Sequence, residues 1–343
     1  MTPTASPAAP MTSSDPGAAL GKLMQVTNAF LISRCLYVAA EIGVADHIAD
    51  APQSTDGLAK ATGSDAGALH RVLRVLASHG IFEARDGAWA HTEMSRFLRS
   101  DDPASMRDYI RMIGMPVFWR AWENIEHSVR TGETAFQKVH PGGVFAYLAG
   151  HPRESSLFNA AMTAKSHGDI AAVLPAYDFS QFTAIADIAG GRGHLLRAIL
   201  KQCPNTHGIL FDQPHVVTEV SPEKGEKLTV VGGSFFADKM PSADCYLLMN
   251  IIHDWADAES IKILSAIRRD MPQHARVLLI ESVVPSSPEP HLSKELDIVM
   301  MVLPGGRERT KDEYADLVAK CGLRVKRVID TKSQYSIVEI VAA

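Results

Sequence analysis

Paired cysteines are missing from this sequence. Its four cysteines, Cys35, Cys203, Cys245 and Cys321, stand singly with no C-x-x-C motif, so neither a zinc knuckle nor a disulfide framework is indicated. A reduced compartment, most simply the cytoplasm, is the expected location.

An excess of positive charge is missing as well. The 343 residues include 34 Lys and Arg against 39 Asp and Glu, a formal net charge of −5, whereas proteins that bind nucleic acid usually carry a basic excess. No apolar run reaches the roughly 18 to 20 residues that span a bilayer. Neither nucleic acid nor a membrane is therefore expected as a partner.

The chain does have enough apolar sequence for two domains of ordinary size. Apolar residues make up 46% of it and charged residues 21%, which excludes a disordered or collagen-like protein. Residues 1–17, rich in Pro, Ala, Ser and Thr, are predicted to be a disordered tail. From Leu20 to Ile48, apolar residues recur at helical spacing on more than one face, which predicts a helix with several neighbours.

Residues 55–98 have the pattern of a winged helix. Two predicted helices are separated by a turn that ends in Asp65, a suitable helix cap, and two short strands flank Asp86-Gly87, a signal of a tight hairpin. Basic and acidic residues nearly balance in this segment, which argues against a face that reads DNA. We therefore predict a helical and winged-helix dimerisation domain over residues 18–105.

Residues 106–177 are predicted to form a helical linker that contributes to a ligand pocket. They carry a set of aromatic and methionine side chains: Met112, Met115, Phe118, Trp119, Trp122, Phe158 and Met162. Such a set is usually part of a core, but it can also wall an apolar ligand pocket.

From residue 178 to residue 343, β-rich runs alternate with helical patterns, which is typical of a parallel sheet covered by helices. Strands are predicted at 184–188, 208–211, 228–231, 245–249, 277–280, 325–329 and 336–341. Together they predict a doubly wound, Rossmann-like α/β domain with seven strands. Its ligand crevice is expected at the carboxyl ends of the strands.

A glycine-rich turn with Gly190, Gly191 and Gly193 follows the first of these strands. Glycine lets the backbone bend sharply and allows a cofactor to approach it closely. The third glycine of the dinucleotide fingerprint would fall on Leu196, which disfavours a nicotinamide cofactor.

Asp212 ends the next predicted strand, about 20 residues beyond the glycines, where a carboxylate can accept both hydroxyls of a ribose. Asp212 could instead cap the strand end before Pro214. A cofactor that contains a nucleoside is the interpretation that these features favour.

Six blocks of sequence follow one another in order: 187–193, 211–214, 232–236, 253–255, 281–285 and 306–310. Together they resemble the S-adenosylmethionine-dependent small-molecule O-methyltransferases of the plant caffeate and hydroxyindole type, with their bacterial relatives, over nearly the whole chain. The resemblance implies that S-adenosylmethionine is the cofactor. Its implied binding residues are Asp187, Gly190, Gly191, Gly193, Asp212, Gln213, Gly233, Ser234, Phe235, Met249 and Asn250.

His253 follows a predicted strand and is therefore expected near the carboxyl edge of the sheet. An imidazole with an unperturbed pKa near 6.5 can take the proton of a phenol at neutral pH. The resemblance implies that Glu281 and Glu308 orient the imidazole and stabilise its charged form. Both glutamates could instead form ordinary ion pairs with Arg307 or Arg309.

Several positions depart from the plant pattern. Ala189 stands where many members have a third consecutive glycine, and Ser234 and Met249 replace an Asp and a Lys that lie beside the cofactor. Val299 replaces an Asn that anchors the plant substrate, which argues against a monolignol acceptor. Asp254 is predicted to cap the helix that follows it.

The resemblance also implies an acceptor pocket in a homodimer, closed by the partner subunit's N-terminal helix. The predicted lining is Met115, Phe118, Trp119, Phe158, Met162, Trp255 and Met300. Such a lining suits a flat aromatic or polyketide-like molecule. Family members of this type need no metal, and no acidic cluster beside the glycine turn resembles the divalent-ion site of catechol-type methyltransferases.

These observations predict an enzyme that transfers a methyl group from S-adenosylmethionine to a hydroxyl of a small metabolite, with His253 as the base. One alternative is transfer to nitrogen, and another is a hydroxylation or decarboxylation assisted by the same cofactor. A ligand-responsive regulator that uses the winged helix and a nicotinamide oxidoreductase are further alternatives.

Overall fold

The computed structural model describes residues 16–48, 51–218 and 220–343, and the chain divides into two compact units between Gly114 and Met115. Residues 1–15 of the predicted tail lie outside the described part. Pro16 and Gly17 already belong to the first helix, so the predicted tail extended two residues too far. The finer division into 18–105, 106–177 and 178–343 stays a prediction.

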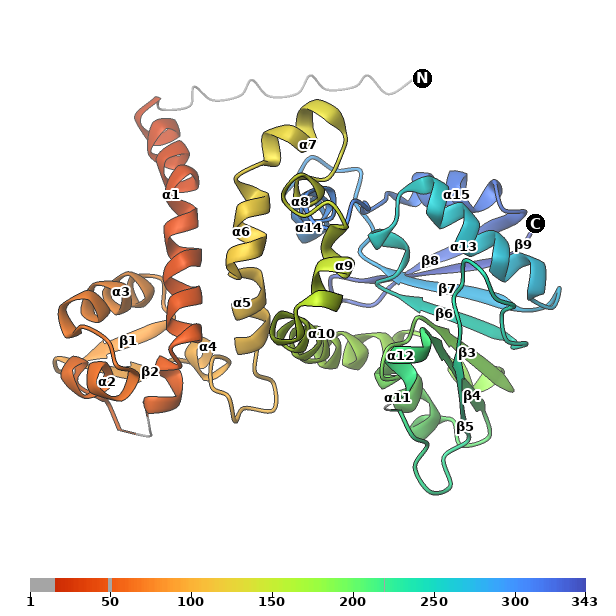
Figure 1. Cartoon of the computed structure of the whole chain (residues 1–343), viewed down its shortest axis with the longest axis horizontal. Helices are drawn as coiled ribbons and strands as arrows, with labels where there is room; N and C mark the ends of the chain where they lie inside the picture. The colour runs from red at the N-terminus through yellow and green to blue at the C-terminus, as the bar shows by residue number, and fades with distance from the viewer. Residues whose placement is uncertain (1–15, 49–50, 219) are drawn as a thin grey trace, which may run out of the picture. The chain divides into compact units, whose positions relative to one another are not determined.

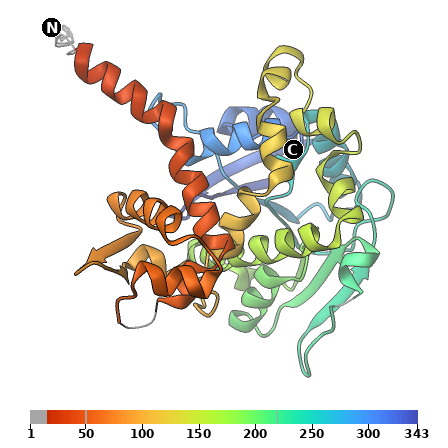
Figure 2. The same cartoon turned by 60° about the vertical axis from the view of Figure 1, so that its left-hand side comes forward.

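The first unit contains the predicted winged helix. Its elements are α1 (Pro16–Glu41), the 3-10 helix η1 (Val44–His47), α2 (Thr55–Thr62), α3 (Ala66–Ser78), β1 (Phe82–Arg85), β2 (Ala88–His91), α4 (Glu93–Arg96) and α5 (Arg107–Ile113). Figure 2 shows α1 as one unbroken red helix, with α2, α3 and the β1–β2 hairpin in orange at its C-terminal end.

Local sequence signals set the ends of these elements. The side chain of Asp65 accepts a hydrogen bond from the backbone N–H of Ala68 at 2.8 Å and so caps α3. Asp86 and Gly87, with φ of 52° and 79°, form the tight turn between β1 and β2. Both features were predicted from the sequence.

Helix α1 is much more exposed than its composition suggests. Only Ala39 and Ala40 are buried, whereas Leu23, Val26 and Phe30 are 61%, 66% and 52% exposed. By length and mean hydropathy, 1.3 over its most apolar window, α1 is able to cross a membrane. The expectation that no apolar segment is long enough to span a bilayer is therefore wrong for α1, in which Arg34 interrupts the most apolar stretch.

The second unit begins with helices and ends with the sheet. Its helices are α6 (Pro116–Trp122), α7 (Ile125–Thr131), α8 (Ala135–Val139), α9 (Gly143–Gly150), α10 (Pro152–Val173), α11 (His194–Gln202), α12 (Pro214–Val217), α13 (Asp257–Asp270), α14 (Leu292–Val302) and α15 (Lys311–Ala319). Short 3-10 helices are η2 (Leu174–Ala176), η3 (Phe179–Gln181) and η4 (Ile252–Asp254).

All seven predicted strands are present. They are β3 (Ala184–Ile188), β4 (His207–Asp212), β5 (Leu228–Gly232), β6 (Cys245–Met249), β7 (Arg276–Glu281), β8 (Leu323–Asp330) and β9 (Ser336–Ala342), in the spatial order β5-β4-β3-β6-β7-β9-β8. The order reverses beside β3, as in a doubly wound fold. One detail differs from a purely parallel sheet, because β9 pairs antiparallel with both β7 and β8.

Two hydrophobic cores cover the two faces of this sheet. Alternate residues of one strand face opposite sides, so Tyr246 and Leu248 join one core, whereas Cys245 and Leu247 join the other. Helices α13 and α15 contribute to the first core, and α10 and α11 to the second. Figure 1 shows α13 and α15 together, apart from α10 and α11. This packing leaves the carboxyl edge of the parallel strands to carry a site.

Candidate active site

His253 lies on a short irregular segment at the carboxyl end of β6. The strand ends at Met249, and Asn250 then takes a left-handed backbone conformation with φ of 56°. This conformation is uncommon for residues other than glycine, and Asn tolerates it better than most. The chain turns there into η4, and His253 is only 8% exposed.

The two predicted carboxylates meet the His253 imidazole on one side. Nδ1 of His253 lies 2.8 Å from Oε1 of Glu308 and 3.8 Å from Oε2 of Glu281. Glu281 is fixed at the end of β7 because its Oε1 accepts the backbone N–H groups of Ile251 and Ile252 at 3.2 and 2.9 Å. The structure therefore brings the three predicted catalytic residues together, and it leaves Nε2 of the imidazole on the other side.

The turn that carries Glu308 is joined to the His253 segment through the backbone. The N–H of Arg307 donates to the carbonyl of His253 at 2.8 Å. The guanidinium of Arg309, 1% exposed, donates to the carbonyls of Ile252 and Trp255 at 3.1 and 3.0 Å. These bonds fix the position of Glu308 relative to the imidazole.

The arginines of this turn do not pair with Glu281 or Glu308. Arg309 pairs with Asp257 at 2.8 Å, and Arg307 pairs with Glu313. The ion-pair interpretation of Glu281 and Glu308 is therefore wrong. Both glutamates have one carboxylate oxygen, Oε2, that is buried without a hydrogen-bond partner in the described structure.

The charges around His253 change its pKa strongly. Burial alone would lower the pKa, but the carboxylates of Glu281 and Asp254 and the hydrogen bond that the imidazole donates to Glu308 outweigh burial and raise it to about 9. The expected value near 6.5 is thus too low for the protein without ligands. Burial in turn raises the pKa of Glu281 to about 7. The imidazole and the carboxylates hold their protons jointly.

Asp254 does not cap a helix. It ends η4, and α13 begins at Asp257 without a side-chain cap. The carboxylate of Asp254 instead lies 3.6 Å from Nε2 of His253. The prediction was wrong because the chain needs two further residues to turn from η4 into α13.

The glycine turn adopts the conformation that its residues suggest. Gly191 and Gly193 have φ of 60° and 75°, and Gly193 precedes the first residue of α11. Ala189 is also left-handed, with φ of 57°, which a third glycine would adopt more easily. A Cβ on Gly191 would meet no atom within 4 Å, so the turn has open space beside it.

Two carboxylates line this turn. Asp187 is 2% exposed at the end of β3, and burial, together with the negative charge of Asp212, raises its pKa to about 7. Asp212 accepts the N–H of Gly191 at 2.8 Å and, as in the capping interpretation, that of Gln213 at 2.6 Å. Among the groups of the described chain that shift the pKa of Asp187, none is positively charged. A ligand with a positively charged group fits this site.

The third predicted cofactor segment follows β5. A Cβ on Gly233 would stand 2.6 Å from the ring of Phe211, so only glycine fits there. The N–H of Ser234 donates to Asp238 at 2.8 Å, and the ring of Phe235 lies 5.9 Å from that of Trp255. Trp255 thus contacts the cofactor segment, although it was predicted to line the acceptor pocket. Met249 ends β6 at this edge, and Asn250 follows it.

The remaining predicted acceptor residues lie on several elements of the second unit. Met115 and Phe118 are buried at the start of and within α6. Phe158 and Met162 are half-buried on one face of α10. Trp119 and Met300, on α6 and α14, are half-buried as well. That these residues together line one acceptor pocket stays a prediction.

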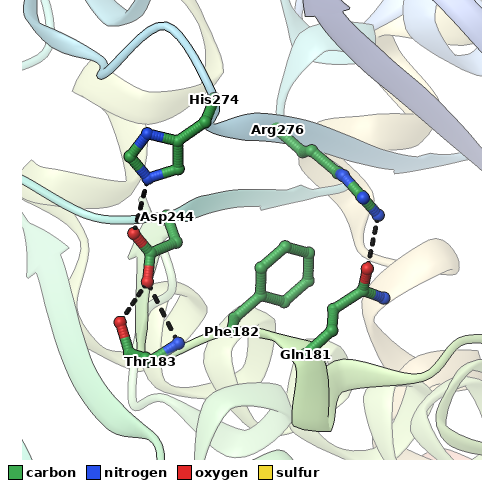
Figure 3. Close-up of a pocket in the computed structure, with 6 residues that line it drawn as sticks. All are labelled: Gln181, Phe182, Thr183, Asp244, His274 and Arg276. Atoms are coloured by element: carbon green, nitrogen blue, oxygen red, sulfur yellow. Dashed lines mark hydrogen bonds and ion pairs between the residues drawn. The ribbon is translucent and has the colours of Figure 1, made fainter.

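One hollow in the described structure lies away from this site. It measures about 420 Å³ and is lined by Gln181, Phe182, Thr183, Asp244, His274 and Arg276. Figure 3 shows Asp244 between His274 and Thr183. These residues precede or begin β3, β6 and β7, so the hollow is at the amino edge of the sheet. Asp244 joins neighbouring strands there through the N–H groups of Thr183 and Ala184.

One atom of each of His253, Glu281 and Glu308 could be offered to a metal ion, since these atoms lie within 4.8 Å of one another. Two of the atoms already form the 2.8 Å hydrogen bond between Nδ1 and Oε1. The hydrogen bonds on Glu281 occupy a further oxygen. The arrangement therefore has the partners expected of an oriented imidazole.

Sequence reasoning missed two features of the site. Gly306 was quoted only as part of a block, yet a Cβ there would stand 1.9 Å from the carbonyl oxygen of His253. Lys165 was not singled out, although its largely buried ammonium group is acted on by the charges of Glu308 and Glu281. Its spacing of three residues from Met162 on α10 was the signal that could have found it.

Comparison with known proteins assigns the family. Residues 122–324 match the O-methyltransferase domain, and residues 24–101 match the O-methyltransferase dimerisation domain. The chain belongs to this family and is an S-adenosylmethionine-dependent methyltransferase of small secondary metabolites. These matches overturn the two alternatives that the chain is a ligand-responsive regulator or a nicotinamide oxidoreductase.

Similar proteins cover nearly the whole chain. The phenazine O-methyltransferase PhzM of Lysobacter antibioticus is 43% identical over 92% of this chain and 94% of its own. The 3-amino-4-hydroxybenzoate 4-O-methyltransferase of Streptomyces cremeus is 36% identical over 91% and 87%. The crystal structure of CalO1, a methyltransferase of calicheamicin biosynthesis with bound S-adenosylhomocysteine, is 35% identical and superposes with a TM-score of 0.87 over 96% and 100%.

Proposed function

We propose that this protein methylates a hydroxyl group of a small aromatic metabolite, with His253 as the general base. The observation that carries the proposal is the buried His253 imidazole, whose Nδ1 is held by Glu308 at 2.8 Å and flanked by Glu281 at the carboxyl edge of the sheet. The hydrogen bond on Nδ1 fixes the ring, so Nε2 is the atom that takes the proton.

The raised pKa of His253 suits the deprotonation of a phenol. A phenol has a pKa near 10, and His253 has a pKa of about 9. The pair of phenolate and imidazolium is then only about 1.4 kcal/mol less stable than the neutral pair, whereas with an imidazole of pKa 6.5 the difference is about 5 kcal/mol. Glu281 and Glu308 supply this stabilisation because they face the imidazolium.

The residues of the glycine turn fit S-adenosylmethionine, which supplies a methyl group activated by a positively charged sulfur. We propose that Asp187 attracts a cationic group of the cofactor, since its buried carboxylate lacks a counter-charge. Asp212 is proposed to receive the ribose hydroxyls, and Gly191 leaves the backbone open to close approach. Gly233, Ser234 and Phe235 form the turn proposed to hold the adenine.

The aromatic character of the acceptor is supported by two observations. The predicted pocket residues are aromatic rings and methionines, which favour flat apolar ligands. The two relatives named above act, by their names, on a phenazine and on an aminohydroxybenzoate. A hydroxylated aromatic ring system is therefore the proposed acceptor.

We also propose a homodimer formed through the first unit. Residues 24–101 match a dimerisation domain, and α1 exposes a row of large apolar side chains that a partner would cover. Substitution of Leu23 and Phe30 by Glu is expected to give monomers in analytical ultracentrifugation. The four cysteines are free thiols, which supports a cytoplasmic setting.

The function is tested first by calorimetric titration with S-adenosylmethionine and S-adenosylhomocysteine, with NAD as the control. Both sulfur ligands are expected to bind and NAD is not. A panel of hydroxylated phenazines, naphthols and hydroxyindoles is then screened for methyl transfer with and without EDTA, and mass spectrometry of the product identifies the methylated atom. Absence of binding of both sulfur ligands would overturn the proposal.

Transfer to nitrogen is the second candidate. The 8-amino-8-demethylriboflavin N,N-dimethyltransferase of Streptomyces davaonensis is 34% identical over 93% of this chain. An amine with a low pKa is neutral at pH 7 and does not need a base to become a nucleophile. Retention of the His253, Glu281 and Glu308 arrangement therefore favours oxygen, and an aminophenol offered to the enzyme decides between the two atoms.

A further inference from the structure

Lys165 is a buried ammonium group for which the proposed mechanism has no role. Its side chain is 15% exposed, on the long helix α10. Nζ donates to the hydroxyl of Tyr335 and lies 4.0 Å from Oδ2 of Asp169. In the described part of the chain, the Tyr335 hydroxyl is its only hydrogen-bond acceptor, so an ammonium with three donors is left incompletely satisfied.

The position of Lys165 places it on the proposed acceptor wall. Phe158, Met162, Lys165 and Asp169 follow at intervals of four, three and four residues, which puts them on one face of α10. The first two are predicted pocket residues. The face thus changes along its length from apolar side chains to a buried cation and a buried carboxylate.

The cation is also close to the catalytic carboxylates. Burial lowers the pKa of Lys165, and the negative charges of Asp169, Glu308, Glu281 and Asp254 oppose this effect. The side chain of Asn250, which follows β6 three residues before His253, acts on the pKa of the Tyr335 hydroxyl and therefore lies close to it. Lys165 and its partners therefore belong to the same edge of the sheet as the proposed base.

We propose that Lys165 selects an acceptor that carries a carboxylate group on its aromatic ring. Apolar pockets orient their ligands through a few polar groups, and a buried ammonium with unused N–H donors is the group that an anionic substituent satisfies best. Tyr335 and Asp169 position the ammonium. This inference deepens the proposed function and rests on it, because it concerns the acceptor of the same site.

The test compares two probes that differ only in the carboxylate, 3-hydroxy-2-naphthoate and 2-naphthol. Their affinities for enzyme saturated with S-adenosylhomocysteine are measured by fluorescence quenching, and kcat/KM is measured where methylation occurs. The wild-type protein is expected to bind the naphthoate at least tenfold more tightly than the naphthol. Lys165→Met should weaken the binding of the naphthoate by about tenfold to a hundredfold. The affinity for the naphthol should stay within about twofold of that of the wild-type protein.

Two variants serve as controls. Lys165→Arg keeps the charge and should retain a preference for the naphthoate, although its geometry differs. Lys262→Met removes an exposed lysine of α13, 65% exposed, and should change neither affinity. Thermal unfolding of Lys165→Met reports whether the variant is folded, and an uncharged side chain of similar length is expected to be tolerated at this position.

The inference is overturned if wild-type protein does not prefer the naphthoate, if neither probe binds, or if Lys165→Met weakens both probes equally. It is also overturned if Lys165→Met weakens the binding of S-adenosylhomocysteine, since the ammonium group would then contribute to the cofactor site. Each of these results leaves the methyltransferase function intact. Failure of wild-type protein to bind S-adenosylhomocysteine would instead remove the proposed function itself.

Discussion

The imidazole of His253 and the carboxylate of Glu308 are separated by 55 residues in the sequence, yet their Nδ1 and Oε1 atoms lie 2.8 Å apart in a buried site. A hydrogen bond between a buried imidazole and a carboxylate is worth more than a surface pair because solvent does not screen it. The pair therefore controls both the orientation and the proton affinity of the proposed base.

Removal of the imidazole should abolish most of the activity without removing the cofactor. His253→Ala is expected to lower kcat by about a hundredfold to ten-thousandfold, the range of general base catalysis, while the Kd for S-adenosylhomocysteine stays within a few-fold. The matched control is His274→Ala, which removes an exposed histidine at the opposite edge of the sheet. Near-normal turnover of His253→Ala would show that another group, or solvent, takes the proton.

The raised pKa of His253 predicts a rise of activity with pH. Below about pH 9 the imidazole of the free enzyme is protonated, so log kcat/KM should increase between pH 7 and 9 and level off above. Glu308→Gln removes a negative charge that raises this pKa, so the plateau should begin at a lower pH, with a smaller maximal rate. An unchanged profile in Glu308→Gln would contradict the electrostatic role of Glu308.

Cofactor affinity should depend on pH through Asp187. Its pKa of about 7 means that the carboxyl group is neutral in acid and attracts a cation only once it ionises. The Kd for S-adenosylhomocysteine, which carries an ammonium group, should therefore be about tenfold weaker at pH 6 than at pH 8. Calorimetry checks this, and Asp187→Asn should bind weakly with little pH dependence. A wild-type Kd that is constant over this range would be inconsistent with the assignment.

Gly306 should tolerate no side chain. In Gly306→Ala the Cβ would meet the backbone of residues 253–255, at 1.9 Å from the carbonyl oxygen of His253, so the turn must move. We expect a loss of at least about 2 kcal/mol in the free energy of unfolding and a large fall in kcat. Gly168→Ala, in the interior of α10 with nothing within 4 Å, is the control and should be neutral or stabilising by up to about 1 kcal/mol. Equal stability of the two variants would refute the close contact.

Asp244 should matter for stability alone. Its pKa is lowered to about 2 by hydrogen bonds from Thr183 and His274 that outweigh burial. A carboxyl group with a lowered pKa stabilises the fold above its unfolded pKa near 3.8, and this contribution disappears as the pH falls through about 2. Asp244→Asn should lower the free energy of unfolding by about 1 to 2 kcal/mol at pH 7. This difference from the wild-type protein should become smaller below pH 4, and kcat should not change. Urea unfolding at several pH values measures it, and a constant difference would contradict the mechanism.

Much of the fold could be predicted from local sequence. The strands 184–188 and 245–249 were placed to the residue, because buried parallel strands are short apolar runs bounded by turns. Asp65, which caps α3, and the Asp86-Gly87 turn between β1 and β2 were also predictable, because caps and tight turns depend on residues that are close in sequence. The antiparallel direction of β9 was not predictable in this way, because strand direction depends on pairing between distant residues.

The candidate site was predictable in its residue types but not in its electrostatics. The resemblance named His253, Glu281 and Glu308, and the structure brings them together. The shift of the His253 pKa to about 9 depends on burial and on three carboxylates converging from separate segments, which no linear spacing reveals. Asp254 was wrongly predicted to cap a helix, because the sequence does not show where η4 ends and α13 begins.

The contrast between Gly306 and Lys165 has a practical consequence for engineering the enzyme. A Cβ on Gly306 would collide with backbone atoms. The side chain of Lys165 on α10 instead contacts other side chains, those of Tyr335 and Asp169. A combinatorial library that seeks new acceptors should therefore keep the codon for residue 306 constant. Its diversity belongs at positions 158, 162 and 165, which the proposed function places on the wall of the acceptor pocket and away from the proposed base.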